Sequence, residues 1–143
     1  MYENYTKQSL PTKEYRELLG TALCVFSSNN SFIIENIIRT SDTFDWYELI
    51  DKESGKLNPD ISKTISEKCG NREIENLFSE IVNMRNRIIH GFRITSEDGE
   101  QILATKTRRA DGNIQFEITQ EYLMDFIKKN DKLSDLLHCY RGY

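Results

Sequence analysis

The apolar residues between positions 74 and 88 constrain the fold of this chain more than any other feature. They recur with the three- and four-residue spacing of one buried helical face: Ile74, Leu77, Phe78, Ile81, Met84 and Ile88. At about 100° per residue, Arg85 falls within roughly 20° of the middle of this apolar stripe. A guanidinium cannot lie alone in an apolar environment without a cost of several kcal/mol. Arg85 therefore needs a carboxylate, a wet cleft or a second subunit beside it.

The same helix pattern ends in polar groups. His90 lies five residues after Arg85, roughly 7.5 Å further along the helix axis, and Asn86 projects to the side between them. Gly91 follows and predicts the end of the helix. The segment therefore places a fixed cation, an amide and a titratable imidazole at one helix terminus.

A purely structural role explains the same residues. The helix dipole favours a histidine near the last turn, and an arginine near a helix end often extends its charge into solvent or meets a nearby acid. Glu35 and Asp42 are the two candidate counter-ions for Arg85, and the sequence does not choose between them.

The run from Arg85 to His90 resembles the signature of the HEPN family (higher eukaryotes and prokaryotes nucleotide-binding domains). That signature has an Arg, then four to six residues, then a His, with Asn, Asp or His often directly after the Arg. Arg85, Asn86 and His90 match it with a gap of four residues, hydrophobic residues in the gap and Gly91 next. The match lies near the end of a late helix in an otherwise helical chain.

This resemblance implies a metal-independent endoribonuclease with no cofactor. Arg85, Asn86 and His90 of both subunits of a symmetric homodimer would converge in one cleft and cleave RNA. It also implies a toxin or a phage-defence factor held in check by an antitoxin, often a small nucleotidyltransferase. The alternative is a catalytically inactive HEPN-like helical module that binds protein or nucleic acid.

The chemistry of these residue types fits RNA cleavage. Histidine titrates near neutrality and can act as general base or acid. A guanidinium donates paired hydrogen bonds to phosphate oxygens and keeps its charge. The motif supplies one histidine per chain, His90, which is too few for both proton transfers and makes a dimer attractive.

The length of 143 residues predicts one domain over 1–143, with a flexible arm over 1–11. We expect a mainly α-helical bundle. Its first helix starts at a Thr12 cap and runs through Phe26, and a second helix covers 32–38 after a turn at 27–31. Later cap and stop signals are Asp42-Thr43 before a short helix over 44–50, Asn58-Pro59 opening a weaker helix to Gly70, Asn71 before the helix that carries Arg85, and Thr119 before the last helix.

The spacing of apolar residues changes after Gly91 from a helical period to the alternation of strands. Alternating runs flank Asp98-Gly99 and Asp111-Gly112, which predicts a three-stranded antiparallel β-meander inserted over 92–118, before the C-terminal helix. With turns at those dipeptides, Lys106 pairs opposite Glu117.

Bulk charge gives no support for nonspecific binding of nucleic acid. The chain has 19 Lys and Arg against 23 Asp and Glu, a net charge of −4, and a pI near 5.3. This acidic balance favours the non-catalytic alternative, so any RNA contact must come from a local patch. The candidate residues for that patch are Arg87, Arg93, Lys106, Arg108 and Arg109.

The cysteines and the apolar runs argue against a disulfide-bonded, a metal-binding or a membrane-spanning protein. Cys24, Cys69 and Cys139 are odd in number and far apart, with neither metal-ligand spacing nor a disulfide framework. His138-Cys139 is not expected to bind a metal, because adjacent helical residues diverge by about 100°. No run reaches the roughly 18 apolar residues of a membrane span. We therefore expect a cytoplasmic protein without a metal or a membrane partner.

Overall fold

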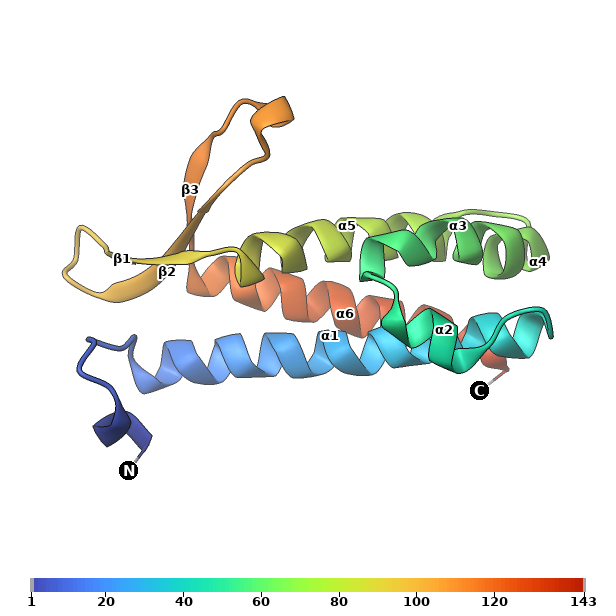
Figure 1. The fold of residues 1–143 in the computed structure, drawn as a ribbon, viewed down its shortest axis with the longest axis horizontal. Helices are drawn as coiled ribbons and strands as arrows, with labels where there is room; N and C mark the ends of the chain where they lie inside the picture. Colours follow the sequence, from blue (N-terminus) through green and yellow to red (C-terminus); the bar gives the residue numbers. More distant parts are fainter. Residues whose placement is uncertain (1, 143) are drawn as a thin grey trace.

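Three long helices form the body of the protein in the computed structural model, which describes residues 2–142 (Figure 1). They are α1 (Lys13–Thr40), α5 (Glu73–Ile89) and α6 (Gln120–Arg141). Helices α1 and α6 lie side by side and run in the same direction, and α5 packs against α6 in the opposite direction. The apolar stripe of α5 faces this packing.

Short helical segments between α1 and α5 cover one end of the bundle, and a small sheet projects from the other end, where the N-terminal helical turn also lies (Figure 1). The helical elements are η1 (Tyr2–Tyr5), α2 (Trp46–Asp51), η2 (Ser54–Leu57), α3 (Asn58–Ile61), the π-helical η3 (Ser62–Ser66) and α4 (Glu67–Cys69). The sheet contains β1 (Phe92–Thr95), β2 (Gln101–Lys106) and β3 (Gln115–Ile118), with η4 (Arg109–Asp111) between the last two strands. The expected mainly helical fold with a meander before the last helix is confirmed.

Aromatic rings from the three long helices meet in the core. The ring of Phe26 on α1 stacks against Phe78 of α5 and Phe126 of α6, with centroids 6.3 and 6.2 Å apart. Phe78 and Phe126 are fully buried. Burying each such ring contributes about 1.5–3 kcal/mol, so this cluster fixes the position of α5 over the other two helices.

The turn expected over 27–31 is wrong, because α1 continues without a break through these residues. Asn29 is buried and donates from Nδ2 to the backbone oxygen of Asn130 at 2.8 Å and to its Oδ1 at 3.0 Å. Asn130 in turn donates to the backbone oxygen of Phe126 at 2.9 Å. The amide that reads as a turn former is therefore satisfied by the neighbouring helix, and packing overrides local propensity.

The expected helix caps are confirmed at Thr12 and Thr119, whereas Asn71 lies one residue before the N-cap of α5, which is Arg72. Thr12 Oγ1 accepts from the Tyr15 amide at 3.2 Å, Thr119 Oγ1 accepts from the Tyr122 amide at 3.0 Å, and Asn71 Oδ1 accepts from the Glu73 amide. Each side chain satisfies a helix N–H that has no partner inside its own helix.

Two other expected caps differ. Helix α2 is capped by Asp45, whose carboxylate accepts from the Glu48 amide at 3.2 Å, and the Asp42-Thr43 assignment is wrong. Asn58 is already helical, because η2 runs directly into α3; the helix then ends, as expected, at Gly70, with φ +74°.

The sheet order is β1-β2-β3 with antiparallel pairing throughout. Lys106 lies opposite Gln115, and Glu117 lies opposite Ala104, so the expected Lys106–Glu117 pair is wrong. The chain reverses around η4 rather than at Asp111-Gly112, and Gly112 and Asn113 both adopt positive φ (97° and 54°) after it. This longer loop shifts the register of β3 by two residues.

Tyr15 anchors the meander to the bundle. Its side chain is only 2% exposed, and its hydroxyl donates to the backbone oxygen of Ile118 at 2.6 Å and accepts from the Leu103 amide at 3.1 Å. Burial raises the pKa of Tyr15, which keeps the phenol protonated for this pair of bonds.

We expect Tyr15→Phe to lower the free energy of unfolding by about 1–3 kcal/mol, because it leaves the buried Ile118 carbonyl and the partly buried Leu103 amide without the Tyr15 hydroxyl. Chemical denaturation followed by circular dichroism measures the change. Tyr47→Phe is the matched control, since Tyr47 is 74% exposed and should lose almost nothing. Equal stability of the two variants would contradict the anchoring role.

Candidate functional site

His90 forms the C-terminal cap of α5. Its backbone N–H donates to the Asn86 carbonyl at 3.1 Å, and its side chain is exposed and makes no hydrogen bond to any residue from 2 to 142. Ile89 just before it and Phe92 just after it are 46% and 42% exposed. The imidazole is thus free to meet a ligand, on a corner that is partly apolar.

Gly91 ends the helix by a different route from the expected glycine cap. Gly91 does not adopt the positive φ of a left-handed glycine cap. Its N–H donates to the Ile88 carbonyl at 3.1 Å. A Cβ at this position would lie 3.0 Å from the Ile88 oxygen and 3.2 Å from the Ala104 oxygen. Gly91 therefore lets β2 pass close to the end of α5, and this approach fixes where His90 stands.

Arg85 points into the molecule. Its guanidinium carbon lies 4.9 Å from the centre of the Phe26 ring, and its Nε is buried without a hydrogen-bond partner. Burial lowers the pKa of Arg85, and the charge of Glu53 partly opposes this effect. Within residues 2–142, Arg85 forms no ion pair.

Neither expected counter-ion of Arg85 is paired with it. Glu35 binds Arg141 at 2.5 Å, and Asp42 takes part in no ion pair with the described cations. The face of an aromatic ring has replaced the carboxylate, an arrangement worth about 0.5–2 kcal/mol.

The three residues of the Arg-Asn-x-x-x-His motif are not gathered in one cavity of a single chain. Five residues correspond to about 140° of rotation around the helix, so Arg85 faces α1 while His90 is exposed at the corner. Asn86 is partly exposed and lines a separate groove. A shared site for Arg85 and His90 would need a second surface.

The groove that Asn86 lines runs between α5, the segment from η2 to α3, and the β2–β3 loop. Its volume is about 620 Å³. Most of its lining is polar: Gly55, Asn58, Asn76, Ser79, Glu80, Val82, Asn83, Asn86, Arg87, Arg108 and Asp111. We call it the α5 groove.

Two of the expected substrate-contacting cations have structural partners. Arg87 donates from Nη1 to the Lys106 carbonyl and so ties α5 to β2, while its Nε is buried without a partner. Arg93 donates to the side chain of Gln101 on the adjacent strand. Both side chains lie near the meander, but their hydrogen bonds already serve the fold.

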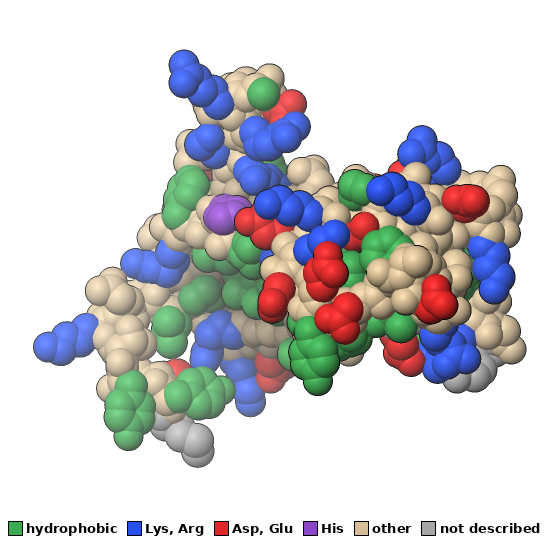
Figure 2. Space-filling view, turned by 45° about the vertical axis from the view of Figure 1, so that its right-hand side comes forward, with side chains coloured by type: hydrophobic (Ala, Val, Ile, Leu, Met, Phe, Trp, Pro, Cys, Tyr) green, Lys and Arg blue, Asp and Glu red, His purple; other side chains and the backbone are tan. Residues whose placement is uncertain are grey.

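The remaining expected cations lie on the β2–β3 hairpin. Lys106 Nζ donates to Asn113 Oδ1 at 2.7 Å, Arg108 pairs with Asp111 at 3.1 Å, and the Arg109 side chain is exposed with no partner among residues 2–142. Figure 2 shows Lys and Arg side chains gathered over this hairpin, while Asp and Glu side chains are spread over the helical body. The structure therefore has a local basic surface despite its net negative charge.

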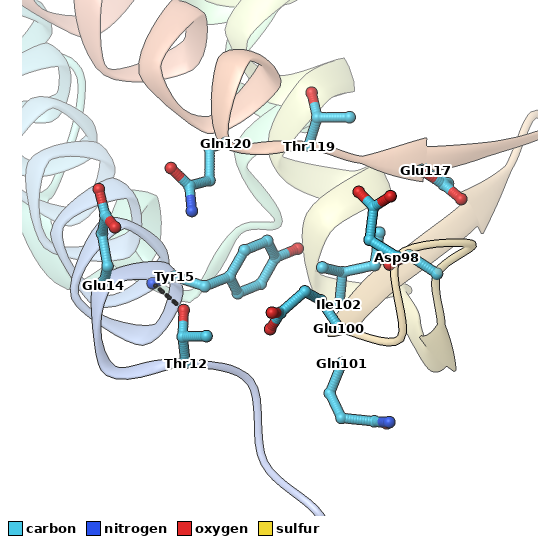
Figure 3. A pocket seen from close by; sticks show the side chains of 11 residues that line it. Thr12, Glu14, Tyr15, Asp98, Glu100, Gln101, Ile102, Glu117, Thr119 and Gln120 are labelled. Atoms are coloured by element: carbon cyan, nitrogen blue, oxygen red, sulfur yellow. Dashed lines mark hydrogen bonds between the residues drawn. The ribbon is translucent and has the colours of Figure 1, made fainter.

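Another cavity has the opposite character. It lies between the starts of α1 and α6 and the β1–β2 turn, and its volume is about 420 Å³. Figure 3 shows carboxylates of Glu14, Asp98 and Glu100 around the Tyr15 ring. The Tyr15 hydroxyl is already committed to the backbone, and this acidic lining repels a phosphate.

Sequence reasoning missed Asn58, Asn76, Ser79 and Asn83 as lining residues of the α5 groove. The signal that could have found them is the recurrence of asparagine at 76, 83 and 86 on a predicted helix, since asparagine is a poor helix former.

Among residues 2–142, no cluster of three or more His, Cys, Asp or Glu side chains could hold a metal ion. Within the same range, no helix is both long enough and apolar enough to traverse a bilayer.

No protein-family model, curated protein or solved structure matches this chain.

Gly91→Ala should destabilise the protein by about 1–3 kcal/mol, because the added Cβ meets two backbone oxygens that cannot move aside easily. Gly20→Ala on α1 is the matched control: its Cβ would meet nothing within 4 Å, and it should stabilise by about 0.5–1 kcal/mol. Thermal unfolding of both variants measures the contrast. A Gly91→Ala variant as stable as Gly20→Ala would show that the close approach is unimportant.

Arg85→Met should leave the free energy of unfolding unchanged or raise it by up to about 1 kcal/mol, because it removes a partly buried cation that forms no ion pair and is only partly compensated by the charge of Glu53. Arg141→Met is the control. Arg141 lies 5.8 Å from the Phe32 ring and also pairs with Glu35, so its loss should cost about 0.5–1 kcal/mol. A larger loss for Arg85→Met than for Arg141→Met would assign Arg85 a structural role.

Proposed function

We propose that this protein is a metal-independent endoribonuclease whose active site forms between two copies of the chain, with Arg85, Asn86 and His90 in catalytic roles. The observation that carries the proposal is the exposed, unbonded imidazole of His90 at the end of α5. It is supported by the motif that these three residues form and by the basic hairpin next to them.

In the proposed reaction the 2′-hydroxyl of one nucleotide attacks the adjacent phosphate and the 5′-oxygen leaves. A base must take the proton of the attacking hydroxyl, and an acid must protonate the leaving oxygen. Imidazole can do either at neutral pH. Each chain contributes one His90, so a pair of chains supplies one base and one acid.

Arg85 would stabilise the negative charge that develops on the phosphate. A planar guanidinium binds two phosphate oxygens at once, which is stronger than its contact with an aromatic ring. In this proposal the side chain leaves the Phe26 ring when RNA binds. The lack of an ion pair among residues 2–142 supports such a move, because no carboxylate has to be released.

The corner around His90 is suited to a second copy of the chain. Ile89 and Phe92 expose apolar surface on both sides of the histidine, and a dimer contact would cover them. Covering this corner would bring two copies of the α5 terminus together and exclude water from the reacting phosphate.

The cations of the β2–β3 hairpin would guide the RNA backbone to the cleft. Arg109 has no partner among residues 2–142, and Lys106 and Arg108 are exposed. An enzyme that cuts RNA endangers the cell that makes it. The proposal therefore includes a toxin or phage-defence role and an inhibitory antitoxin, for which a small nucleotidyltransferase is the HEPN precedent.

The second candidate is a catalytically inactive helical module that binds protein or nucleic acid. The placement of Arg85 over Phe26, away from His90, favours it, as does the net charge of −4. In that case RNA binds without being cut.

We expect the purified protein to cleave RNA in the presence of EDTA, and His90→Ala and Arg85→Ala each to lower the rate by about 100-fold or more. Gel analysis of a labelled RNA measures the cleavage, and circular dichroism checks the fold of each variant. The 2′-hydroxyl mechanism also predicts products that end in a 2′,3′-cyclic phosphate.

His138→Ala is the matched control, because His138 is the other histidine of the chain and belongs to the far end of α6. It should cut like the wild type. RNA that stays intact with the wild type, or that is cut equally well by His90→Ala, would rule out this active site and favour the binding module.

A further inference from the structure

One face of α5 carries a row of uncharged polar side chains. Asn76, Ser79, Asn83 and Asn86 follow one another at intervals of three and four residues, and all four line the α5 groove. At 1.5 Å per residue the row extends over about 15 Å of helix. We call these residues the asparagine stripe.

The fold does not require this stripe. None of the three asparagine side chains makes a hydrogen bond to residues 2–142, and Asn76 and Asn83 are exposed. Asparagine is less favourable than alanine in a helix by up to about 0.7 kcal/mol per residue. Three such residues on one face lower the stability of α5 and leave three amides, each with donors and an acceptor, directed at the groove.

The opposite wall adds another unused hydrogen-bonding group. Asn58, at the start of α3, lines the groove, and its Oδ1 is buried without a partner. An unpaired buried acceptor costs about 1–3 kcal/mol. A ligand that donates an N–H to this oxygen, after rotation of the Asn58 side chain toward the groove, would recover that cost.

The charges in the groove are balanced. Arg87 and Arg108 are offset by Glu80 and Asp111, and Arg108 and Asp111 pair with each other at 3.1 Å. A chain of phosphates would find no net attraction here. A ligand with neutral, planar groups rich in donors and acceptors fits this lining better.

We infer that the α5 groove binds unpaired bases of single-stranded RNA, with the asparagine stripe reading their edges. This inference rests on the proposed function for the choice of RNA as ligand. Bases in single strands expose their edges to side chains, and an asparagine amide pairs with adenine at N6 and N7. Adenine also offers the amino group that Asn58 Oδ1 lacks. At about 3.4 Å per nucleotide of one strand, the stripe spans about 4 bases.

The test measures binding separately from cleavage. Short fluorescent oligoadenylate and oligouridylate are titrated with the His90→Ala protein at one fixed salt concentration, and fluorescence anisotropy gives each Kd. We expect oligoadenylate to bind at least tenfold more tightly. Adding Asn76→Ala and Asn83→Ala together should weaken oligoadenylate binding at least tenfold and remove the preference.

Two controls separate base reading from other effects. Alanine favours helix, so the Asn76→Ala, Asn83→Ala protein should melt no lower than its parent. Asn4→Ala, an exposed asparagine on η1, should leave both Kd values unchanged. Arg109→Ala, outside the groove lining, should reduce the salt dependence of binding for both oligonucleotides, whereas the asparagine variants should not.

The outcomes separate the two proposals. Absence of binding, equal binding of both oligonucleotides, or unchanged binding by the double asparagine variant would overturn the groove assignment. If the adenine preference is present and depends on the stripe while the wild type does not cut RNA, the nuclease proposal fails and the groove assignment stands. If the wild type cuts RNA and the asparagine variants bind unchanged, only the groove assignment fails.

Discussion

The Phe26 ring of α1 stacks against one ring from each of the other two long helices, Phe78 of α5 and Phe126 of α6. The orientation of α5 follows from that contact. Phe78 lies on the same face of α5 as Arg85, so seating Phe78 against Phe26 also brings the guanidinium of Arg85 over the Phe26 ring. The rotation of the helix then leaves His90 exposed at its end. One packing contact therefore decides which motif side chain is held inside the protein and which meets solvent.

Features with a local physical cause could be predicted from the sequence. The amphipathic period of α5, the caps at Thr12 and Thr119 and the strand alternation around Asp98-Gly99 depend on residues close to one another in the chain. The continuity of α1 could not be predicted, because Asn29 reads as a turn former until its bonds to Asn130 on another helix are known. The register of β3 against β2 could not be predicted either, because it depends on the conformation of the whole loop around η4.

The candidate site likewise has features that the sequence predicts and features that depend on residues distant in the chain. Periodicity alone placed Arg85 on an apolar stripe and His90 at a helix end, and both placements agree with the structure. The partner of Arg85 could not be predicted, because a ring on another helix, Phe26, stands where a carboxylate was expected. The α5 groove could not be predicted either, because amides such as those of Asn76 and Asn83 are uncharged and non-titrating, and the opposite wall comes from residues distant in the chain.

The first long helix finds its partners at the far end of the chain. Asn29 bonds to Asn130, Tyr15 to Ile118 and Glu35 to Arg141, pairs that are 101, 103 and 106 residues apart. On a ribosome that adds about 5–20 residues per second, each of these α1 residues is synthesised roughly 5–20 s before its partner near the end of the chain. During that interval the face of α1 that packs against α6 has no partner and is open to chaperones and to other nascent chains.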